Sequence, residues 1–317
     1  MQTQESSVTS YAQKVLNQVR KAVVGKDKTL LWVLAAFIAR GHILLEDIPG
    51  VGKTTMALAF SRTLGLSHNR VQFTPDVLPS DVTGYSVLNQ TDGRLDYRPG
   101  AILCNLFLAD ELNRATSRTQ SALLEAMEEG QVTVDGISHP LPKPFLVIAT
   151  QNPTGAAGTQ LLPDSQMDRF TVCLSLGYPS ARDEAAMVLS RQGQDPLKAM
   201  TPLMTPEALL AAQEAVDRTY ISEEVVNYVV ALIHATRSSE LLHRGASPRA
   251  TLSVVAMSKA IAQLRGRDYV VPKDVQEVLA PTLSHRLQIS AKAESKGMTP
   301  QQILRELLQE VPAPKLR

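Results

Sequence analysis

The residues with the clearest chemistry lie between positions 46 and 55, where a glycine-rich turn follows an apolar run and precedes a helix-like run. Strand, turn and helix in this order are typical of a phosphate-binding loop, because backbone N–H groups and the helix dipole surround an anion. Lys53 is expected to reach the β- and γ-phosphates of a nucleotide, and the hydroxyl of Thr54 to ligate Mg²⁺. The residues predicted to bind the nucleotide in this loop are Pro49, Gly50, Val51, Gly52, Lys53, Thr54 and Thr55.

This loop departs from the pattern G-x-x-x-x-G-K-[ST] at its first position, where the chain has Asp47. Pro49 and Gly50 supply the turn instead. Taken alone, the loop is also compatible with a simple Pro-Gly turn followed by a solvated lysine. A second group of polar residues is therefore needed to decide between these interpretations.

That second group is the acidic pair Asp110 and Glu111, which ends the mostly apolar run 102–109. Such a run indicates a buried parallel strand, and ligands of open α/β sheets bind at the carboxyl ends of the strands. Asp110 is expected beside the Mg²⁺ of the loop, and Glu111 is expected to polarise the water that attacks the γ-phosphate. An acidic helix cap is the plainer alternative, but the pair together with the loop favours an ATPase.

Three later residues are candidates for the same chemistry. Asn152 ends a third apolar run and is expected to orient the attacking water or to contact the γ-phosphate, although asparagine before proline is also an ordinary turn. Arg249 falls in the first turn of a helix capped by Ser247, where a cation is unfavourable unless it faces an anion such as phosphate. Arg169 and Arg249 are otherwise explained as surface ion-pair residues.

Composition excludes several classes of protein. The net charge of +1 provides no basic field that would attract nucleic acid or an anionic membrane, and 4% aromatic residues argue against a base-stacking surface. The N-terminal residues lack the features of a signal peptide, and the apolar run 30–39 is too short to span a bilayer. Cys104 and Cys173 have no metal-binding spacing. We therefore expect a cytoplasmic protein without membrane insertion.

Caps and turns indicate the elements. Residues 10–40 are predicted to be helical with a break at 23–26, and turns at 91–93 and 135–136 predict two β-hairpins. Ser117 to Gln120 form a predicted capping box for a helix that stops at Gly130. Helix starts after residue 178 are predicted at Ser180, Thr205, Ser222, Ser247 and Thr299. The C-terminal part is therefore predicted to be all-α.

The order of these features resembles the AAA+ ATPases. The connecting sequence resembles one of their families more closely, the MoxR family in the helix-2-insert branch. The segments that carry this likeness are residues 73–84, 110–115, 120–136, 149–153 and 245–250. The chain departs from the family at 154–160, where MoxR proteins usually carry acidic and glutamine residues.

The resemblance implies an α/β P-loop nucleotide domain over residues 1–178, with a parallel sheet flanked by helices. A smaller all-α lid domain would follow over residues 179–317. It also implies that Val24 and Gly25 lie beside adenine, so the two are candidate backbone contacts. The two hairpins would be the helix-2 insert and the hairpin before the sensor strand, both projecting toward the pore of a ring. Solvated surface hairpins are the alternative.

By the same resemblance, the protein would be a ring-forming homo-oligomer, a hexamer, that hydrolyses ATP with Mg²⁺ and remodels or matures other proteins. Arg169 of one subunit would reach the γ-phosphate bound to the next, and a von Willebrand factor A domain protein would be its partner. The alternatives are the ATPase subunit of a magnesium-chelatase-like complex, a nucleic-acid motor, and a scaffold that only holds nucleotide. Neutral charge argues against the motor, and intact Glu111, Asn152 and Arg169 argue against the scaffold.

Overall fold

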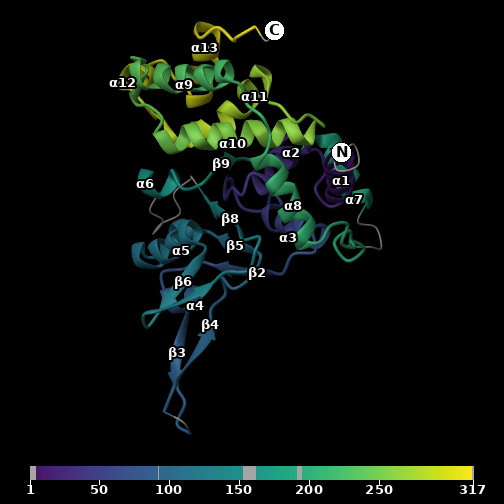
Figure 1. The fold of residues 1–317 in the computed structure, drawn as a ribbon, viewed down its shortest axis with the longest axis vertical. Helices are drawn as coiled ribbons and strands as arrows, with labels where there is room; N and C mark the ends of the chain where they lie inside the picture. Colours follow the sequence, from purple (N-terminus) through teal and green to yellow (C-terminus); the bar gives the residue numbers. More distant parts are fainter. Residues whose placement is uncertain (1–4, 92, 153–161, 191–194, 316–317) are drawn as a thin grey trace.

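The apolar runs of the chain form a five-stranded parallel sheet in the order β2–β5–β8–β1–β9. The computed structural model describes residues 5–91, 93–152, 162–190 and 195–315 (Figure 1). The strands of the sheet are β1 (Ile43–Glu46), β2 (His68–Gln72), β5 (Leu106–Asp110), β8 (Leu146–Gln151) and β9 (Val172–Leu174). β5 and β8 are buried along their whole length, as expected for central parallel strands covered on both faces. Their carboxyl ends lie side by side, which brings Asp110 close to the end of β8.

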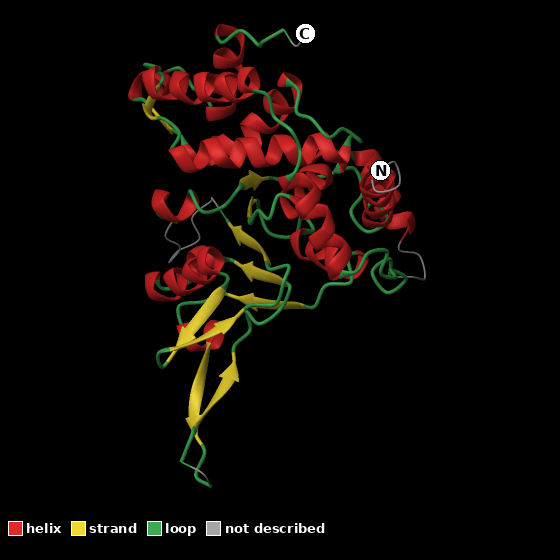
Figure 2. Cartoon of the chain, viewed as in Figure 1, coloured by secondary structure: helices red, strands yellow, loops and turns green. Residues whose placement is uncertain are grey.

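Helices lie on both sides of this sheet. In Figure 2, viewed as in Figure 1, α5 lies on one side and α3 on the other, with the long α10 above. The helices of the first part are α1 (Glu5–Val19), α2 (Asp27–Ile38), α3 (Lys53–Thr63), α4 (Pro79–Thr83), α5 (Ser117–Glu129), α6 (Asp164–Met167) and the short 3₁₀ turn η1 (Leu112–Arg114). The predicted break at 23–26 separates α1 from α2. Before α3, Gly50 and Gly52 have φ angles of 85° and 98°, which glycine adopts at little cost. These two glycines therefore make the tight turn of the phosphate loop possible.

Both predicted hairpins are confirmed. The first pairs β3 (Gly84–Leu88) with β4 (Leu95–Pro99), and the second pairs β6 (Gln131–Val134) with β7 (Ile137–Pro140). Figure 1 shows β3 and β4 extending away from the body, at the end opposite the C-terminal helices. The ring of Tyr97 stacks on that of His139, with centroids 3.6 Å apart and an angle of 11°. The stack joins the two hairpins into one projecting unit.

The C-terminal part is helical, as predicted. It consists of α7 (Ala181–Ser190), α8 (Pro206–Asp217), α9 (Glu223–Ser238), α10 (Pro248–Leu264), α11 (Pro272–Leu283), η2 (Ser284–Arg286), α12 (Ala291–Ser295), α13 (Pro300–Glu310) and one short strand pair, β10 (Leu242–Arg244) with β11 (Gln288–Ile289). The predicted caps Thr205, Ser222, Ser247 and Thr299 each accept a backbone N–H of the first helical turn. We retain residue 178 as the proposed domain boundary, which falls in the segment between β9 and α7.

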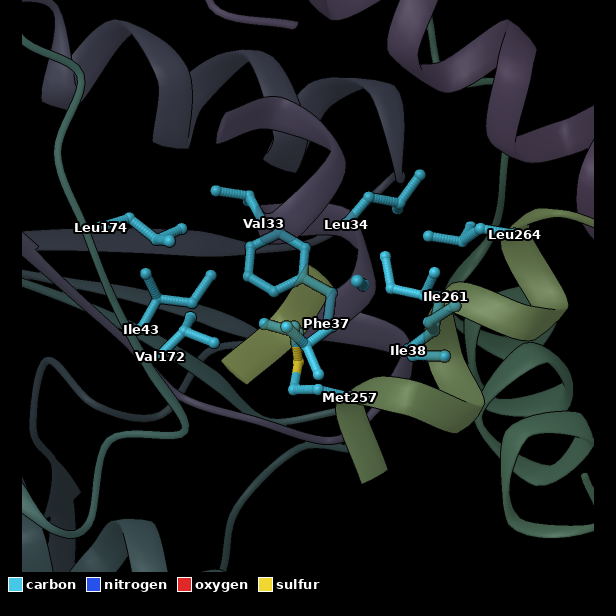
Figure 3. Packing of buried hydrophobic residues seen from close by; sticks show 14 of the residues in the cluster. Val33, Leu34, Phe37, Ile38, Ile43, Val172, Leu174, Met257, Ile261 and Leu264 are labelled. Carbon is cyan, nitrogen blue, oxygen red and sulfur yellow. The ribbon is translucent and has the colours of Figure 1, made fainter. Parts of the chain in front are cut away.

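One hydrophobic core runs through both parts of the chain. In Figure 3, Phe37 of α2 lies between Ile43 and Val172 of the sheet and Met257 of α10. Phe37, Ile43 and Met257 are fully buried. α10 therefore packs against α2, and α2 packs against the sheet.

The sequence predicts both ends of α5, one wrongly and one correctly. The capping box at Ser117 is wrong, because the N-cap of α5 is Thr116, whose hydroxyl accepts the N–H of Thr119 at 3.3 Å. The C-terminal stop at Gly130 is confirmed, with φ of 64°. The departure from the family at 154–160 lies outside the described residues. Within the described ranges, no helix has both the length and the apolarity needed to cross a bilayer.

Candidate nucleotide site

The predicted phosphate-binding residues surround one cavity of about 360 Å³ at the carboxyl edge of the sheet. It is lined by Pro49, Gly50, Gly52, Lys53, Thr54, Thr55, Arg70, Gln72, Asp110, Glu111, Thr150, Gln151 and Asn152. Loop, acidic pair and asparagine thus come together from three separate strands. Lys53 and Arg70 are the cationic residues of this lining, and Asp110 and Glu111 are the acidic ones.

Lys53 is held inside the phosphate loop. Its ammonium donates to the carbonyl oxygens of Asp47 and Ile48, both at 2.9 Å. Burial lowers the pKa of Lys53, and the nearby charges of Asp47, Asp110 and Glu111 oppose this lowering. A bound phosphate would supply further negative charge, so we expect Lys53 to exchange the loop carbonyls for phosphate oxygens.

The carboxylate of Asp110 is fixed by two residues from neighbouring strands. Thr150 donates its hydroxyl to one oxygen at 2.6 Å, and Arg70 donates Nη2 and Nε to the other at 2.6 and 3.2 Å. The same Thr150 hydroxyl accepts the N–H of Glu111 at 2.8 Å. Thr150 therefore sets the orientation of both acidic residues at once.

Glu111 has an uncommon backbone conformation. Its φ is 57°, in the left-handed region, which costs a non-glycine residue about 1–3 kcal/mol and is typical of functional sites. Its carboxylate oxygen Oε2 lies 2.9 Å from Nε of Arg114, an ion pair without hydrogen-bond alignment. With this backbone conformation Glu111 lines the cavity at the end of β5.

The oxygen donors present fit a magnesium ion that arrives with a nucleotide. Thr54 and Asp110 offer one hydroxyl and one carboxylate at the same cavity. Among the described residues, no cluster of three or more His, Cys, Asp or Glu side chains could hold a metal ion by itself. Mg²⁺ typically takes one or two protein oxygens and completes its shell with phosphate and water. Arg70 would have to yield part of its contact with Asp110 to such an ion.

A second cavity, of about 380 Å³, adjoins the first through the shared loop residues Pro49, Gly50, Gly52 and Thr55. Its other lining residues are Ala22, Val23, Val24, Lys26, Val51, Tyr178, Pro179, Glu184 and Met187. Its position and mixed apolar lining suit an adenine base, and it includes the predicted Val24 and Val51. Gly25 is not part of this lining. Its φ is 74°, and a Cβ there would lie 2.3 Å from the Asp183 carboxylate. Close packing against Asp183 therefore explains why this position is a glycine.

Asp47, at the position where the loop pattern has glycine, connects the loop to the segment between β9 and α7. Its buried carboxylate accepts the Ser175 hydroxyl at 3.1 Å, the N–H of Gly177 at 3.2 Å and the N–H of Leu176. These three residues follow β9 and lead into α7. The departure from the pattern is therefore explained by a side chain that fixes the segment between the two domains.

We expect Asp47→Asn to loosen this segment. An amide cannot accept at both of its ends, so hydrogen bonds to a charged acceptor, worth about 1.5–3 kcal/mol each, are weakened or lost. Hydrogen exchange at residues 175–177 should rise, while ATP affinity stays within about threefold, since Lys53 and Thr54 are untouched. Asp76→Asn, at an exposed aspartate, is the matched control. Unchanged exchange at 175–177 would show that Asp47 does not anchor the segment.

The two predicted arginines lie elsewhere. Arg169 and Arg249 line a third cavity, of about 230 Å³, together with His42, Met127 and Glu128. None of these residues lines the phosphate cavity. Arg169 Nη2 lies 3.0 Å from one oxygen of Glu128, and Arg249 Nη2 contacts the other. The structure thus brings the two arginines to each other and not to the phosphate loop of their own chain.

His42, in the same cavity, is neutral. Its Nδ1 accepts the N–H of Val147 at 3.1 Å, and its Nε2 lies 3.2 Å from the carbonyl oxygen of Met127. These contacts define the tautomer with hydrogen on Nε2. Burial lowers the pKa of His42 to about 4, so the cationic charge of this cavity comes from the arginines alone.

The residues of these sites that the sequence did not predict include Arg70, Thr150, Glu128 and Tyr178. Thr150 had a local signal, because it is a hydroxyl at the end of an apolar run. Arg70 and Glu128 carried none, because their partners lie 40 or more residues away.

Comparison with known proteins agrees with this geometry. The model of the ATPase family associated with various cellular activities (AAA) matches residues 42–172, and that of the AAA lid domain matches residues 234–307. Chaperone MoxR1 of Mycobacterium tuberculosis is 38% identical over 96% of this chain and 82% of its own. The chain belongs to the MoxR family of AAA+ ATPases.

Two further similarities support the MoxR assignment and the fold. YeaC of Bacillus subtilis is 41% identical over 96% of this chain and 95% of its own. The solved structure of a proposed ATPase from Cytophaga hutchinsonii has a TM-score of 0.89 and 34% identity, covering 98% of this chain and 97% of that one. The resemblance inferred from five segments of sequence is thereby confirmed. Membership in a MoxR family of chaperone-like AAA+ ATPases implies nucleotide binding, usually with Mg²⁺.

Proposed function

We propose that the protein is a Mg²⁺-dependent ATPase that works as a ring and remodels or matures other proteins. The observation that carries the proposal is the single cavity in which Lys53 and Thr54 face Asp110, Glu111 and Asn152. Phosphate loop, metal ligand, base and water-orienting amide are the parts that phosphoryl transfer to water requires.

In this proposal each residue has a separate task. Lys53 binds the β- and γ-phosphates, and Glu111 accepts a proton from the attacking water. The water oxygen bonds to the γ-phosphorus while the bond from that phosphorus to the β–γ bridging oxygen breaks, and ADP leaves with that oxygen. Asn152 orients that water. Thr54 and Asp110 would hold Mg²⁺, which would supply positive charge to the phosphate groups. Thr150 keeps the two acids in register through its hydrogen bonds to the Asp110 carboxylate and the Glu111 backbone.

The positions of the arginines support the ring in this proposal. Within the described residues, the only arginine lining the phosphate cavity is Arg70, which is engaged with Asp110. Arg169 and Arg249 lie together at another place on the surface, half exposed. We infer that they serve the nucleotide of a neighbouring subunit, which makes hydrolysis conditional on assembly into a homo-oligomer, a hexamer in this proposal.

Contact with a client is assigned to the paired hairpins. Their outward side chains include several large apolar residues between 42% and 59% exposed: Tyr85, Val87, Leu88, Leu95 and Ile137. Exposed apolar side chains gathered on one projecting unit are typical of a surface that contacts other proteins. As the family resemblance implies, we extend the proposal to a partner with a von Willebrand factor A domain.

The test is the dependence of activity on protein concentration. ATP turnover per subunit should rise with concentration as rings form, and ATP should favour the ring because it is bound from both sides of an interface. Turnover and molar mass, measured across the same dilution series by a coupled assay and light scattering, should rise together. Lys53→Ala is the control that removes nucleotide binding. A monomer with full, concentration-independent turnover would contradict the shared site.

A further inference from the structure

Glu128 joins the two arginines that the proposed function assigns to a neighbouring nucleotide. It lies near the end of α5, and its two carboxylate oxygens face different guanidinium groups. Oε2 lies 3.0 Å from Arg169 Nη2, and Oε1 accepts from Arg249 Nη2. Each arginine uses one terminal nitrogen in this contact, so the carboxylate acts as a bridge between α10 and the segment after α6.

The backbone that carries Arg169 is also held by the lid. Arg286 of η2 is 5% exposed and donates Nη2 to the carbonyl oxygens of Asp168 and Phe170, at 3.1 and 2.7 Å. Ser247, the cap of α10, donates to the Asp168 carboxylate at 3.0 Å. These hydrogen bonds hold the backbone of Arg169 against the start of α10, which carries Arg249. The directions of the two side chains are then determined by their own contacts.

The charges show why a carboxylate is needed at this point. Arg169, Arg249 and Arg286 carry three positive charges against the two negative charges of Glu128 and Asp168. Burial lowers the pKa of Arg286 to about 10. The carboxylate of Asp168 opposes this lowering, and the positive charge of Arg249 adds to it. Without Glu128 the excess charge would double, and the Arg169 and Arg249 side chains would move apart.

One guanidinium donor of this pair is left without a partner among the described residues. Arg169 Nε is buried and has no hydrogen-bond partner within the part of the chain that the structure describes. The cavity of about 230 Å³ beside it is lined by both arginines and Glu128. A net positive site with an unused guanidinium donor is suited to an anion with several oxygens, such as a phosphate group.

We propose that Glu128 is a positioning residue for ATP hydrolysis, which aligns Arg169 and Arg249 of its own subunit as a pair for the nucleotide of the neighbour. The inference rests on the proposed function. Glu128 touches neither nucleotide nor water in this scheme, and it acts only through the two arginines. If Glu128 instead acted as a brake, by holding the arginines away from phosphate, removal of its charge would raise turnover.

The test compares Glu128→Gln with Glu129→Gln, the adjacent exposed glutamate on the same helix end. Glu128→Gln should lower kcat by about 10- to 100-fold, the range produced by misplacing a catalytic group by an ångström or less. KM for ATP and the fraction of assembled rings should stay at parent values. Glu128 lines neither the phosphate cavity nor the cavity suited to adenine. Glu129→Gln should match the parent, and Glu128→Asp, which keeps the charge on a shorter arm, should lie between.

Subunit mixing identifies where Glu128 acts. Glu128→Gln subunits keep an intact nucleotide site, and Lys53→Ala subunits keep intact Glu128, Arg169 and Arg249. Mixed rings should therefore regain activity above the sum of the two separate variants. In an Arg169→Ala background, Glu128→Gln should cause less than a threefold further loss.

Each other outcome overturns the inference. Unchanged kcat would show that Glu128 positions nothing, and raised kcat would show that it is a brake. A rise in KM with constant kcat, or no recovery in mixed rings, would place its effect in its own subunit. Absence of ATP hydrolysis by the parent ring would instead contradict the proposed function, so the two failures are distinguishable.

Discussion

Arg169→Ala is expected to bind ATP as the parent does and to hydrolyse it about 10³–10⁵-fold more slowly, the range by which an arginine supplied in trans accelerates other nucleotide hydrolases. The reason is positional. Arg169 lies outside the phosphate cavity of its own chain, so removing it leaves Lys53 and Thr54 intact. Its guanidinium would stabilise charge on the γ-phosphate oxygens of the neighbour only in the transition state, and kcat rather than ATP affinity should therefore fall.

Single-turnover hydrolysis by assembled rings, with ATP affinity measured separately, checks this result. Arg305→Ala, which removes an exposed arginine of α13, is the matched control. Mixing Arg169→Ala with Lys53→Ala subunits should restore part of the activity, because some interfaces again join an intact site to an intact arginine. Near-parent hydrolysis by Arg169→Ala rings would exclude Arg169 and make Arg114 the next residue to test, although Arg114 pairs with Glu111 of its own chain.

The phosphate cavity could be predicted from sequence because its signals are local. A glycine turn before Lys53 and an acidic pair after a buried strand each define a strand end, and parallel strands place such ends along one edge. Asn152 follows the same rule. The sheet, hairpins and most helix starts were equally accessible, since caps and turns depend on a few adjacent residues.

The errors and omissions have physical causes. Thr116 and Ser117 are both suitable N-caps. Which of them caps α5 depends on the residue at which the preceding 3₁₀ turn η1 ends. The role of Asp47 depends on the packing of β9 and its following segment, 128 or more residues away. The environment of Arg249 could be predicted only in part. The sequence required an anion near the start of α10, but only the fold identifies Glu128 as one.

Glu111→Gln is expected to keep ATP and Mg²⁺ binding and to lower kcat by roughly 10²-fold or more, the scale of a lost general base. Glutamine has nearly the shape of glutamate, so the left-handed backbone at this position and the hydrogen bond from its N–H to Thr150 should remain. What is lost is the carboxylate that accepts the proton of the attacking water. Arg114 loses its ion-pair partner at the same time.

Three variants separate these effects. Lys53→Ala should lose nucleotide binding itself, whereas Glu111→Gln should retain it, which divides binding from chemistry. Arg114→Ala breaks the same ion pair and leaves the carboxylate, so its kcat should fall far less than that of Glu111→Gln. Glu125→Gln, at an exposed position of α5, controls for the loss of one negative charge. The measurements are Kd for ATP and kcat from steady-state hydrolysis.

The Glu111→Gln variant should also retain the client protein. A ring that binds ATP and does not hydrolyse it should stay assembled and keep its client, because nucleotide is held from both sides of each interface. Rings of Glu111→Gln isolated with ATP should therefore retain bound protein that parent rings release. Hydrolysis by Glu111→Gln at the parent rate would show that Glu111 is not the base. Equal losses in Glu111→Gln and Arg114→Ala would assign the effect to their ion pair instead.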